Sequence, residues 1–234
     1  GLMKYYDSKR SPAGYASYIN TAAPSDRFYD DNIWLGIDFT DLYLLTGNKE
    51  YLAKAEEIWK FIESGIDNRL DGGIYWCEQK KQSKNACSNA PGAVFAAKLY
   101  LATDNQDYLD MAKGMYIWAQ ENQSEALSLA GNSGLMIQAG ALLFRITSRL
   151  PYLEDARSKA VFCHETFFKP AEGPDGKPFM KMDDDLDPWQ KTLMVRGLID
   201  LYNTDGEPGY VNDIRKSMEK VWSETESGLR IHDR

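Results

Sequence analysis

Two adjacent aspartates, Asp30 and Asp31, stand between aromatic residues in the stretch Arg27–Gly36. Apolar side chains follow them close to helical spacing, which predicts that a helix begins here. Consecutive side chains at a helix start diverge by roughly 100°, so both carboxylates can border one cavity. Cleavage of a sugar acetal needs such a pair, because an ionised carboxylate attacks or stabilises the anomeric carbon while a protonated one serves the leaving oxygen.

The same pair has a simpler interpretation as the beginning of a helix. Either Asp30 or Asp31 can cap the helix, because a carboxylate accepts hydrogen bonds from the free amides of the first turn. The other aspartate is then an ordinary acid of that turn. The pair alone does not decide between the two interpretations.

Composition limits the classes of function. The chain has 234 residues, enough to bury a substantial core as one large domain or two small ones. A net charge of −8 argues against nucleic acid, other polyanions or an anionic membrane surface as the main partner. No apolar run approaches the roughly 20 residues that span a bilayer. A neutral ligand such as a glycan is compatible with this composition.

Cysteines and histidines are few. The three cysteines, Cys77, Cys87 and Cys163, are an odd number, which excludes complete pairing within the chain. Cys77 and Cys87 either form a disulfide or, as we favour, remain small buried residues. The only histidines are His164 and His232, which argues against a Ser-His-Asp triad or a multi-histidine metal site.

A pattern repeats along the chain. Each copy contains a helix end, a short polar turn and a second helix that carries a tyrosine near its start, at Tyr51, Tyr108, Tyr152 and Tyr210. The second helices are amphipathic, whereas the first are apolar on all sides, as in Pro91–Ala97. A helix that is apolar all round is buried, and one with a polar stripe faces solvent. Four inner–outer helix pairs therefore belong to an open solenoid or to a closed α/α toroid.

The predicted fold class is accordingly all-α. With Leu2–Tyr6 as the end of a preceding helix, we expect eight to nine helices, fewer than an (α/α)6 toroid contains. We therefore expect one domain over residues 1–234 whose N-terminal helices lie outside the chain. Loops that precede the inner helices gather at one end of a toroid and carry function.

Those loops contain aromatic and amide side chains suited to a sugar. Tyr75 and Trp76 could stack on the apolar face of a sugar ring, and Asn85 and Asn89 could exchange hydrogen bonds with hydroxyls. The alternatives are a core position for Trp76 and local turn capping for the two asparagines. Asn132 either lies at the same end of the toroid as Asn85 and Asn89 or caps the third inner helix.

The last loop is rich in proline, glycine and aspartate. Phe167–Asp187 is predicted to be irregular chain. Its acidic run Asp183–Asp187 would offer clustered oxygens to calcium, but it lacks the spacing of an EF-hand, and a solvated acidic loop explains it better. Lys191 and Arg196 follow on an otherwise buried helix and need acidic partners, so they line the site or brace its carboxylates.

Several of these stretches together resemble glycoside hydrolase family 76, the endo-α-1,6-mannanases and their relatives. They are Tyr29–Trp34, Gly72–Trp76, Lys84–Asn89, Asn132–Gly134, and Lys191 with Arg196. The resemblance covers nearly the whole chain in the right order, and the tandem aspartates before an aromatic inner helix are its most specific part. It departs from the family at Gln190–Thr192, where the family has Phe-Lys-Gly, and in the short loop before Asn132.

The resemblance implies an (α/α)6 barrel that hydrolyses α-1,6-linked mannose backbones with retention of configuration. By match to the family, Asp30 is the expected nucleophile and Asp31 the expected general acid/base, about 5–5.5 Å apart. Tyr29 and Trp34 are expected to contact substrate together with the loop residues named above. We expect an α-mannan substrate, no cofactor or metal, no nucleic-acid partner, a monomer, and an extracellular, periplasmic or cell-surface location.

Two other functions stay open. Another sugar-active enzyme on the same toroid, an epimerase or an unsaturated-uronide hydrolase, would need histidines in its cavity or basic residues for a uronate. A helical module that binds glycans without cleaving them would keep its activity after the loss of Asp30 or Asp31.

Overall fold

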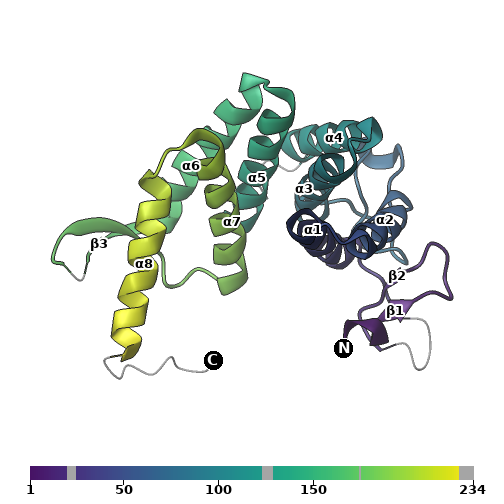
Figure 1. Ribbon diagram of the computed structural model, residues 1–234, viewed down its shortest axis with the longest axis horizontal. Coiled ribbons are helices and arrows are strands. Elements are labelled where there is room, and N and C mark those ends of the chain that lie inside the picture. The colour runs from purple at the N-terminus through teal and green to yellow at the C-terminus, as the bar shows by residue number, and fades with distance from the viewer. Residues whose placement is uncertain (20–24, 123–128, 174, 227–234) are drawn as a thin grey trace. The chain divides into compact units, whose positions relative to one another are not determined.

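The computed structural model describes residues 1–19, 25–122, 129–173 and 175–226, and most of them are helical (Figure 1). The α-helices in these ranges are α1 (Tyr29–Thr46), α2 (Lys49–Glu63), α3 (Ala86–Thr103), α4 (Gln106–Asn122), α5 (Ala130–Thr147), α6 (Leu150–Phe167), α7 (Pro188–Asp205) and α8 (Gly209–Glu226). The remaining elements are the 3-10 helices η1 (Leu2–Lys4) and η2 (Arg69–Asp71) and the strands β1 (Tyr6–Asp7), β2 (Gly14–Tyr15), β3 (Phe168–Glu172) and β4 (Pro178–Met182). The predicted succession of four helix pairs is confirmed.

The chain divides into two compact units, and each is described by itself. Unit 1 comprises Gly1–Ser128 with Leu142–Arg149, and unit 2 comprises Leu129–Ala141 with Leu150–Arg234. Helix α5 therefore contributes to both units. In the described part of the chain, no helix has an apolar stretch long enough to cross a membrane. The sequence-based assignment of a single domain stays a prediction.

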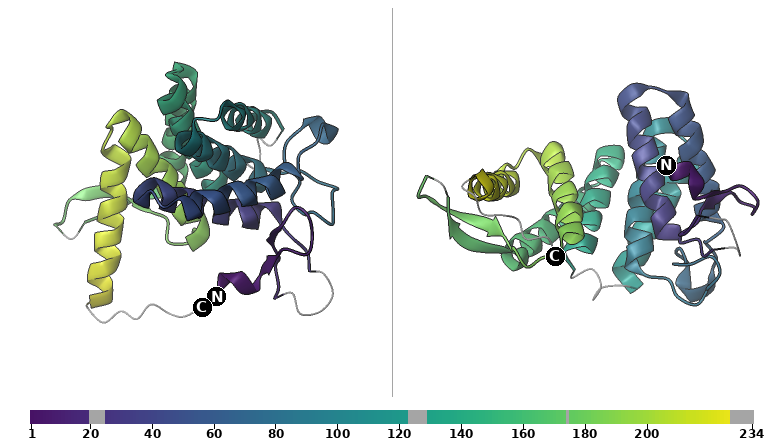
Figure 2. Two further views of the ribbon diagram at one scale, coloured as in Figure 1. Left: turned by 45° about the vertical axis from the view of Figure 1, so that its right-hand side comes forward. Right: turned by 90° about the horizontal axis from the view of Figure 1, so that it is seen from below.

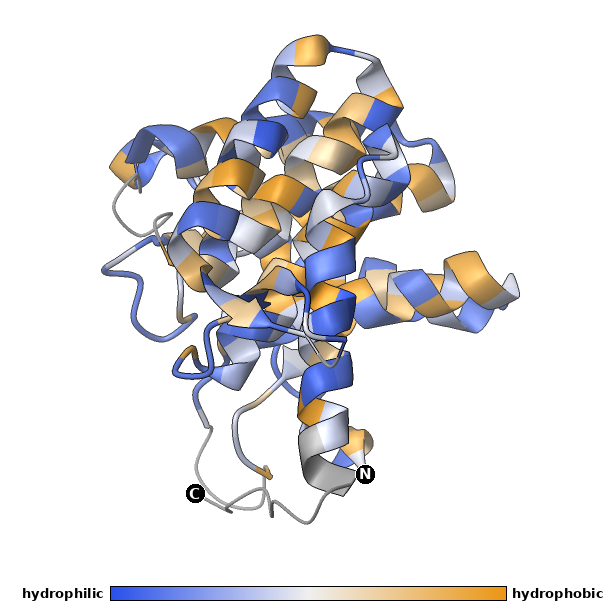
Figure 3. Ribbon diagram, turned by 90° about the vertical axis from the view of Figure 1, so that its left-hand side faces the viewer, coloured by the Kyte–Doolittle hydropathy of each residue, from blue (hydrophilic) through white to orange (hydrophobic). Residues whose placement is uncertain are grey.

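In unit 1, the inner helices α1 and α3 pack together, with α2 against α1 and α4 against α3 (Figures 1 and 2). Helix α3 is buried along most of its length, from Ala86 to Leu99. The two inner helices approach closely at Gly36, where an added Cβ would lie 2.2 Å from the ring of Phe95. Hydrophobic and hydrophilic residues form bands along the helices, as expected where one side is buried (Figure 3).

In unit 2, α5 and α7 meet backbone to backbone. A Cβ added at Gly197 would lie 2.0 Å from the carbonyl oxygen of Gly134, and one added at Gly134 would lie 2.4 Å from Cα of Met194. One turn further along, the side-chain amide of Gln138 donates to Asp200 at 2.6 Å. Helix α8 packs against α7 and against β4 (Figure 2).

The N-terminal segment differs from its prediction. Leu2–Tyr6 is not the end of a helix but a single 3-10 turn followed by β1. The carboxylate of Asp7 accepts hydrogen bonds from the amides of Lys9 (3.0 Å) and Arg10 (3.3 Å). This turns the chain back, so that Tyr6 pairs with Tyr15 in an antiparallel hairpin.

The segment before α7 also differs from its prediction. The sequence predicts irregular chain, whereas β3 and β4 form an antiparallel hairpin whose turn contains Gly173 and Gly176. The acidic run that follows is partly neutralised, because Asp183 pairs with Lys169 (2.6 Å) and Asp184 with Lys181 (2.7 Å). These lysine contacts agree with an acidic loop on the protein surface.

The crossing of α5 and α7 gives a test by substitution. Gly197→Ala should lower the free energy of unfolding by about 2–3 kcal/mol, because the new methyl group meets backbone that no rotamer change can move. The matched control is Gly114→Ala in α4, where the position is exposed and no atom lies within 4 Å of an added Cβ. That change should raise stability by about 0.5–1 kcal/mol. Urea denaturation of both variants checks this, and equal effects would contradict the close crossing.

Candidate active site

Helix α1 begins where the loop between α2 and α3 covers its first turn. Phe28 is extended (φ −98°, ψ 135°) and forms an isolated β-bridge with Cys77. The amide of Tyr29 donates to the carbonyl of Trp76 at 2.9 Å. A distant carbonyl thus satisfies the first free amide of the helix, which a capping side chain would otherwise serve.

The prediction that Asp30 or Asp31 caps the helix is therefore wrong. The capping position belongs to Phe28, whose side chain makes no capping hydrogen bond, and both aspartates lie inside the first turn. The positive end of the helix dipole favours negative charge at these positions. Neither aspartate therefore occupies the N-cap position.

Asp30 is largely withdrawn from water. The indole Nε1 of Trp76 donates to Oδ2 of Asp30 at 3.2 Å, whereas Oδ1 is buried and has no hydrogen-bond partner among the described residues. Burial and the neighbouring charge of Asp31 raise the pKa of Asp30 to about 6, against the opposing effect of nearby backbone amides and the indole. A carboxyl with this pKa exchanges its proton near neutral pH.

Asp31 is the more exposed member of the pair. Partial burial raises its pKa as well. Two carboxyl groups whose charges interact titrate as a unit, so the pair retains a proton to higher pH than two isolated aspartates would. One ionised and one protonated carboxyl side by side can perform nucleophilic and acid catalysis.

Cys87 is a neighbour of Asp30 that the sequence did not indicate. Its thiol donates to Oδ1 of Asn85 at 2.9 Å, and burial together with the charge of Asp30 raises the pKa of Cys87 to about 11. Its position near the start of α3 could have indicated this proximity, because the inner helices begin at the same end of the fold. Cys77, Cys87 and Cys163 are all free thiols, so the alternative of a disulfide between the first two is not realised.

An ion pair between a buried lysine and a half-buried aspartate fixes the loop that carries Trp76. The side chain of Lys84 is fully buried. Its ammonium donates to the carboxylate of Asp67 (2.9 Å), to the carbonyl of Asp67 (2.8 Å) and to the carbonyl of Arg69 (2.7 Å). The bond from Lys84 to the carboxylate, together with hydrogen bonds from Arg69, holds the pKa of Asp67 well below its usual range. Removal of Lys84 would leave these three oxygen atoms without this donor.

Two predicted binding residues are buried and form hydrogen bonds within this loop. Asn89 is fully buried, and its amide group pairs with both the N–H (2.7 Å) and the C=O (3.2 Å) of Ile74. Tyr75 is 1% exposed, and its hydroxyl donates to Asp67. In the structure both residues therefore position the loop, because their polar groups are already bonded within the protein.

The other predicted residues of unit 1 differ in exposure. Tyr29 has no exposed surface and stacks on Phe61 with ring centroids 4.7 Å apart, so it belongs to the core. Asn85 precedes α3 and accepts from the Cys87 thiol. Trp34 is half-buried on α1. Trp76 is 39% exposed and reaches Asp30, which makes it the aromatic residue best placed beside the pair.

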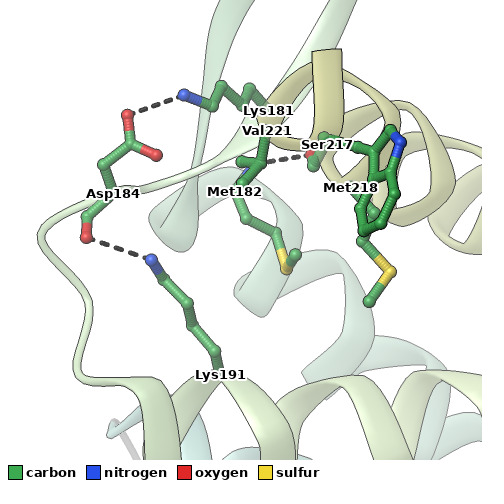
Figure 4. Close-up of a pocket in the computed structure, with 8 residues that line it drawn as sticks. Lys181, Met182, Asp184, Lys191, Ser217, Met218 and Val221 are labelled. Atoms are coloured by element: carbon green, nitrogen blue, oxygen red, sulfur yellow. Dashed lines mark hydrogen bonds and ion pairs between the residues drawn. The ribbon is translucent and has the colours of Figure 1, made fainter. Parts of the chain in front are cut away.

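Asn132, Lys191 and Arg196 lie in unit 2 and are half-buried there. Asn132 is not in a loop but within the first turn of α5. Lys191 lines a mostly apolar cavity of about 360 Å³ and donates to the carbonyl of Asp184 at 3.0 Å (Figure 4). Met182 and Met218 contribute to the apolar wall. The binding roles of these three residues stay predictions.

The candidate site contains two carboxyl groups in the first turn of α1. In the described ranges, no group of three or more His, Cys, Asp or Glu side chains is arranged to hold a metal ion. The residues that unit 1 brings together are Asp30, Asp31, Trp76 and Cys87.

The raised pKa of Asp30 predicts a cost in stability. The folded state holds the Asp30 proton up to a pH of about 6, whereas the unfolded chain loses it near the ordinary value of 3.8. Stability therefore falls as pH rises between these values and stays lower above them. Asp30→Asn should stabilise the protein by about 1–3 kcal/mol at about pH 7.5 and have little effect at about pH 4. Urea denaturation at both pH values tests this, and a pH-independent effect would contradict it.

Comparison with known proteins identifies relatives of the chain. Residues 3–128 match the model of Glycosyl hydrolase family 76. A family 76 glycoside hydrolase (mannosidase) from Bacteroides thetaiotaomicron VPI-5482 is 33% identical, with a TM-score of 0.84 over 92% of this chain and 64% of its own. A family 76 glycoside hydrolase from a bovine Bacteroides thetaiotaomicron strain is 30% identical, with a TM-score of 0.86 over 95% of this chain and 52% of its own. A comparison with curated protein sequences found no match.

A third similar structure is a mannanase bound to a sugar. It is an inactive variant of the α-1,6-mannanase of Salegentibacter sp. HEL1_6, in which two consecutive aspartates are replaced by alanine, in complex with α-1,6-mannotetrose. It is 25% identical, with a TM-score of 0.70 over 83% of this chain and 64% of its own.

The chain thus spans between about half and two thirds of the length of these relatives. The likenesses confirm the predicted fold class, paired helices of the (α/α)6 toroid. Because the family model matches more than half of the chain and a relative is 33% identical across 92% of it, the chain belongs to glycosyl hydrolase family 76.

Proposed function

We propose that this chain carries the catalytic pair of a retaining endo-glycoside hydrolase that cleaves α-1,6-mannosidic bonds in mannan. The observation that carries the proposal is the tandem pair Asp30–Asp31 in the first turn of an inner helix, partly buried and with raised pKa values. The inactive mannanase variant that binds α-1,6-mannotetrose lacks two consecutive aspartates. In this chain consecutive aspartates occur only here and at 183–185, where two of the three pair with lysines.

The proposed reaction has two steps. A carboxylate oxygen of Asp30 bonds to the anomeric carbon, the bond to the glycosidic oxygen breaks, and that oxygen takes the proton of Asp31. Asp31, now ionised, then removes a proton from water. The water oxygen displaces Asp30 from the anomeric carbon, so the configuration is retained and both carboxyl groups return to their starting states.

Burial raises the pKa of Asp30 to about 6, and two kinds of contact oppose this effect by favouring the ionised carboxylate. The indole of Trp76 and the backbone amides of the first turn stabilise the ionised form of Asp30. Asp31 is more exposed, as a group that meets a leaving oxygen and then a water molecule must be. Since the two carboxyl groups share their titration, the pair can hold one proton and one charge at the same time.

Activity on mannan tests the proposal. Asp30→Asn and Asp31→Asn should each reduce the release of manno-oligosaccharides from debranched α-1,6-mannan by about 10³-fold or more, because neither amide can replace its carboxyl group. The protein should include any sequence that flanks this chain. Asp183→Asn is the matched control, since it alters the other run of aspartates and should leave activity nearly unchanged. Full activity of either pair variant would exclude the proposed mechanism.

Azide rescue distinguishes the roles of the two aspartates. With an aryl glycoside of an α-1,6-manno-oligosaccharide, whose leaving group needs no proton, Asp31→Ala should still form the glycosyl-enzyme, and azide should release it as an α-glycosyl azide. Asp30→Ala should instead give the β-glycosyl azide, because azide then attacks the substrate directly. Proton NMR of the products identifies the anomers. The opposite pattern would exchange the two roles.

A further inference from the structure

Trp76 makes a different contact from the one its sequence suggests. A platform for a sugar presents the face of its ring, but the ring of Trp76 packs on Phe28, with centroids 4.7 Å apart at 44°. Its polar edge turns to α1, where Nε1 donates to Oδ2 of Asp30 at 3.2 Å. The side chain thus joins the loop between α2 and α3 to the candidate catalytic pair.

The main chain of Trp76 is held on both sides. Its carbonyl accepts the amide of Tyr29 at 2.9 Å, and its own amide donates to the carbonyl of Ser83 at 3.3 Å. The residue before it forms a β-bridge with Lys84, and the residue after it forms one with Phe28. Because backbone and side chain both bond to the start of α1, the indole has little freedom to leave Asp30.

The two oxygens of Asp30 are consequently different. Oδ2 accepts the indole hydrogen bond, and Oδ1 is buried with no partner among the described residues. An unpaired buried carboxylate oxygen destabilises the folded state. Destabilising features of this kind occur at functional sites, where they are part of the mechanism. In a carboxylate whose second oxygen is fixed, the rotation that could turn the first away from a substrate is restricted.

We propose that Trp76 is a positioning residue, whose indole holds Oδ2 of Asp30 and leaves Oδ1 as the atom that bonds to the sugar. This inference rests on the proposed function. In the first step Oδ1 forms the bond to the anomeric carbon, and the electron pair of the broken bond stays on the leaving oxygen, which Asp31 protonates. The negative charge of Asp30 disappears in this step, and until then the indole N–H restricts the rotation of the carboxylate through its bond to Oδ2.

The same hydrogen bond affects the proton of Asp30. The indole favours the ionised carboxylate and lowers its pKa against the larger effect of burial. Loss of the indole N–H should therefore raise the pKa of Asp30 further and shift the acidic limb of activity to higher pH. A residue that only stacked on a sugar would change the KM and leave this limb in place.

The test compares two tryptophan variants. Trp76→Phe removes the indole N–H and keeps an aromatic ring against Phe28. It should raise the pKa of Asp30 by about half a unit to one unit, measured by carbon NMR titration of the labelled carboxylates. It should also lower kcat on α-1,6-mannan by about 10- to 100-fold, with a smaller change in KM.

Trp118→Phe is the matched control. The indole of Trp118 donates to the carbonyl of Leu70 in the same loop, at 3.1 Å, whereas the indole that donates to Asp30 is that of Trp76. Its loss should leave both the Asp30 titration and the pH profile unchanged, whatever it costs in stability. A similar shift in both variants would mean that general loosening of the loop, not the indole bond, is responsible, and would overturn the inference.

The two proposals fail in different ways. An unchanged Asp30 titration in Trp76→Phe overturns the positioning role, and a raised KM with unchanged kcat and pH profile assigns Trp76 to sugar stacking instead. If the unaltered protein does not cleave α-1,6-mannan, the proposed function is wrong, and the catalytic role inferred for Trp76 is wrong as well. The NMR titration still decides whether the indole controls Asp30.

Discussion

The hydrogen bond from the amide of Tyr29 to the carbonyl of Trp76 is the contact on which the candidate site depends. It joins the first turn of α1 to a loop 47 positions further along the chain. Because this loop satisfies the amide, no side chain of α1 has to do so, and Asp30 and Asp31 lie within the helix and not at its capping position. The same loop places an indole donor on Asp30. This tertiary contact thus lies at the start of the helix and beside the residue that donates to Asp30.

That loop has support in addition to its backbone hydrogen bonds and β-bridges. The support comes from polar side chains that face the interior. Lys84 binds three oxygen atoms of Asp67 and Arg69, and Asn89 binds both backbone groups of Ile74. Such buried polar groups add little net stability but tolerate few alternative conformations when all their partners are present. A loop held in this way can keep the indole N–H of Trp76 within hydrogen-bonding distance of the Asp30 carboxylate.

The candidate pair also shows a conflict between stability and function. Burial of Asp30 and its closeness to Asp31 raise its pKa, so the ionised form weakens the folded state near neutral pH. A protein selected for stability alone would have an amide or an apolar residue at this position. Glycines elsewhere in the fold favour stability, since Gly36, Gly134 and Gly197 allow inner helices to approach closely. Tight packing of this kind can offset a costly pair of charges.

The sequence by itself determined the succession of inner and outer helices, the tandem aspartates and the resemblance to family 76, because helical periodicity and adjacent residues are local properties. It did not determine which polar and aromatic side chains face a ligand. Tyr75, Asn89 and Tyr29 have suitable chemistry, yet they are buried because the loop and the core use their groups. Nor did it indicate Cys87, or the 3.2 Å bond between residues 46 positions apart that ties Trp76 to Asp30. Such contacts depend on how a loop folds back over a helix. Local sequence patterns do not predict this folding, so only the tertiary structure decided these contacts.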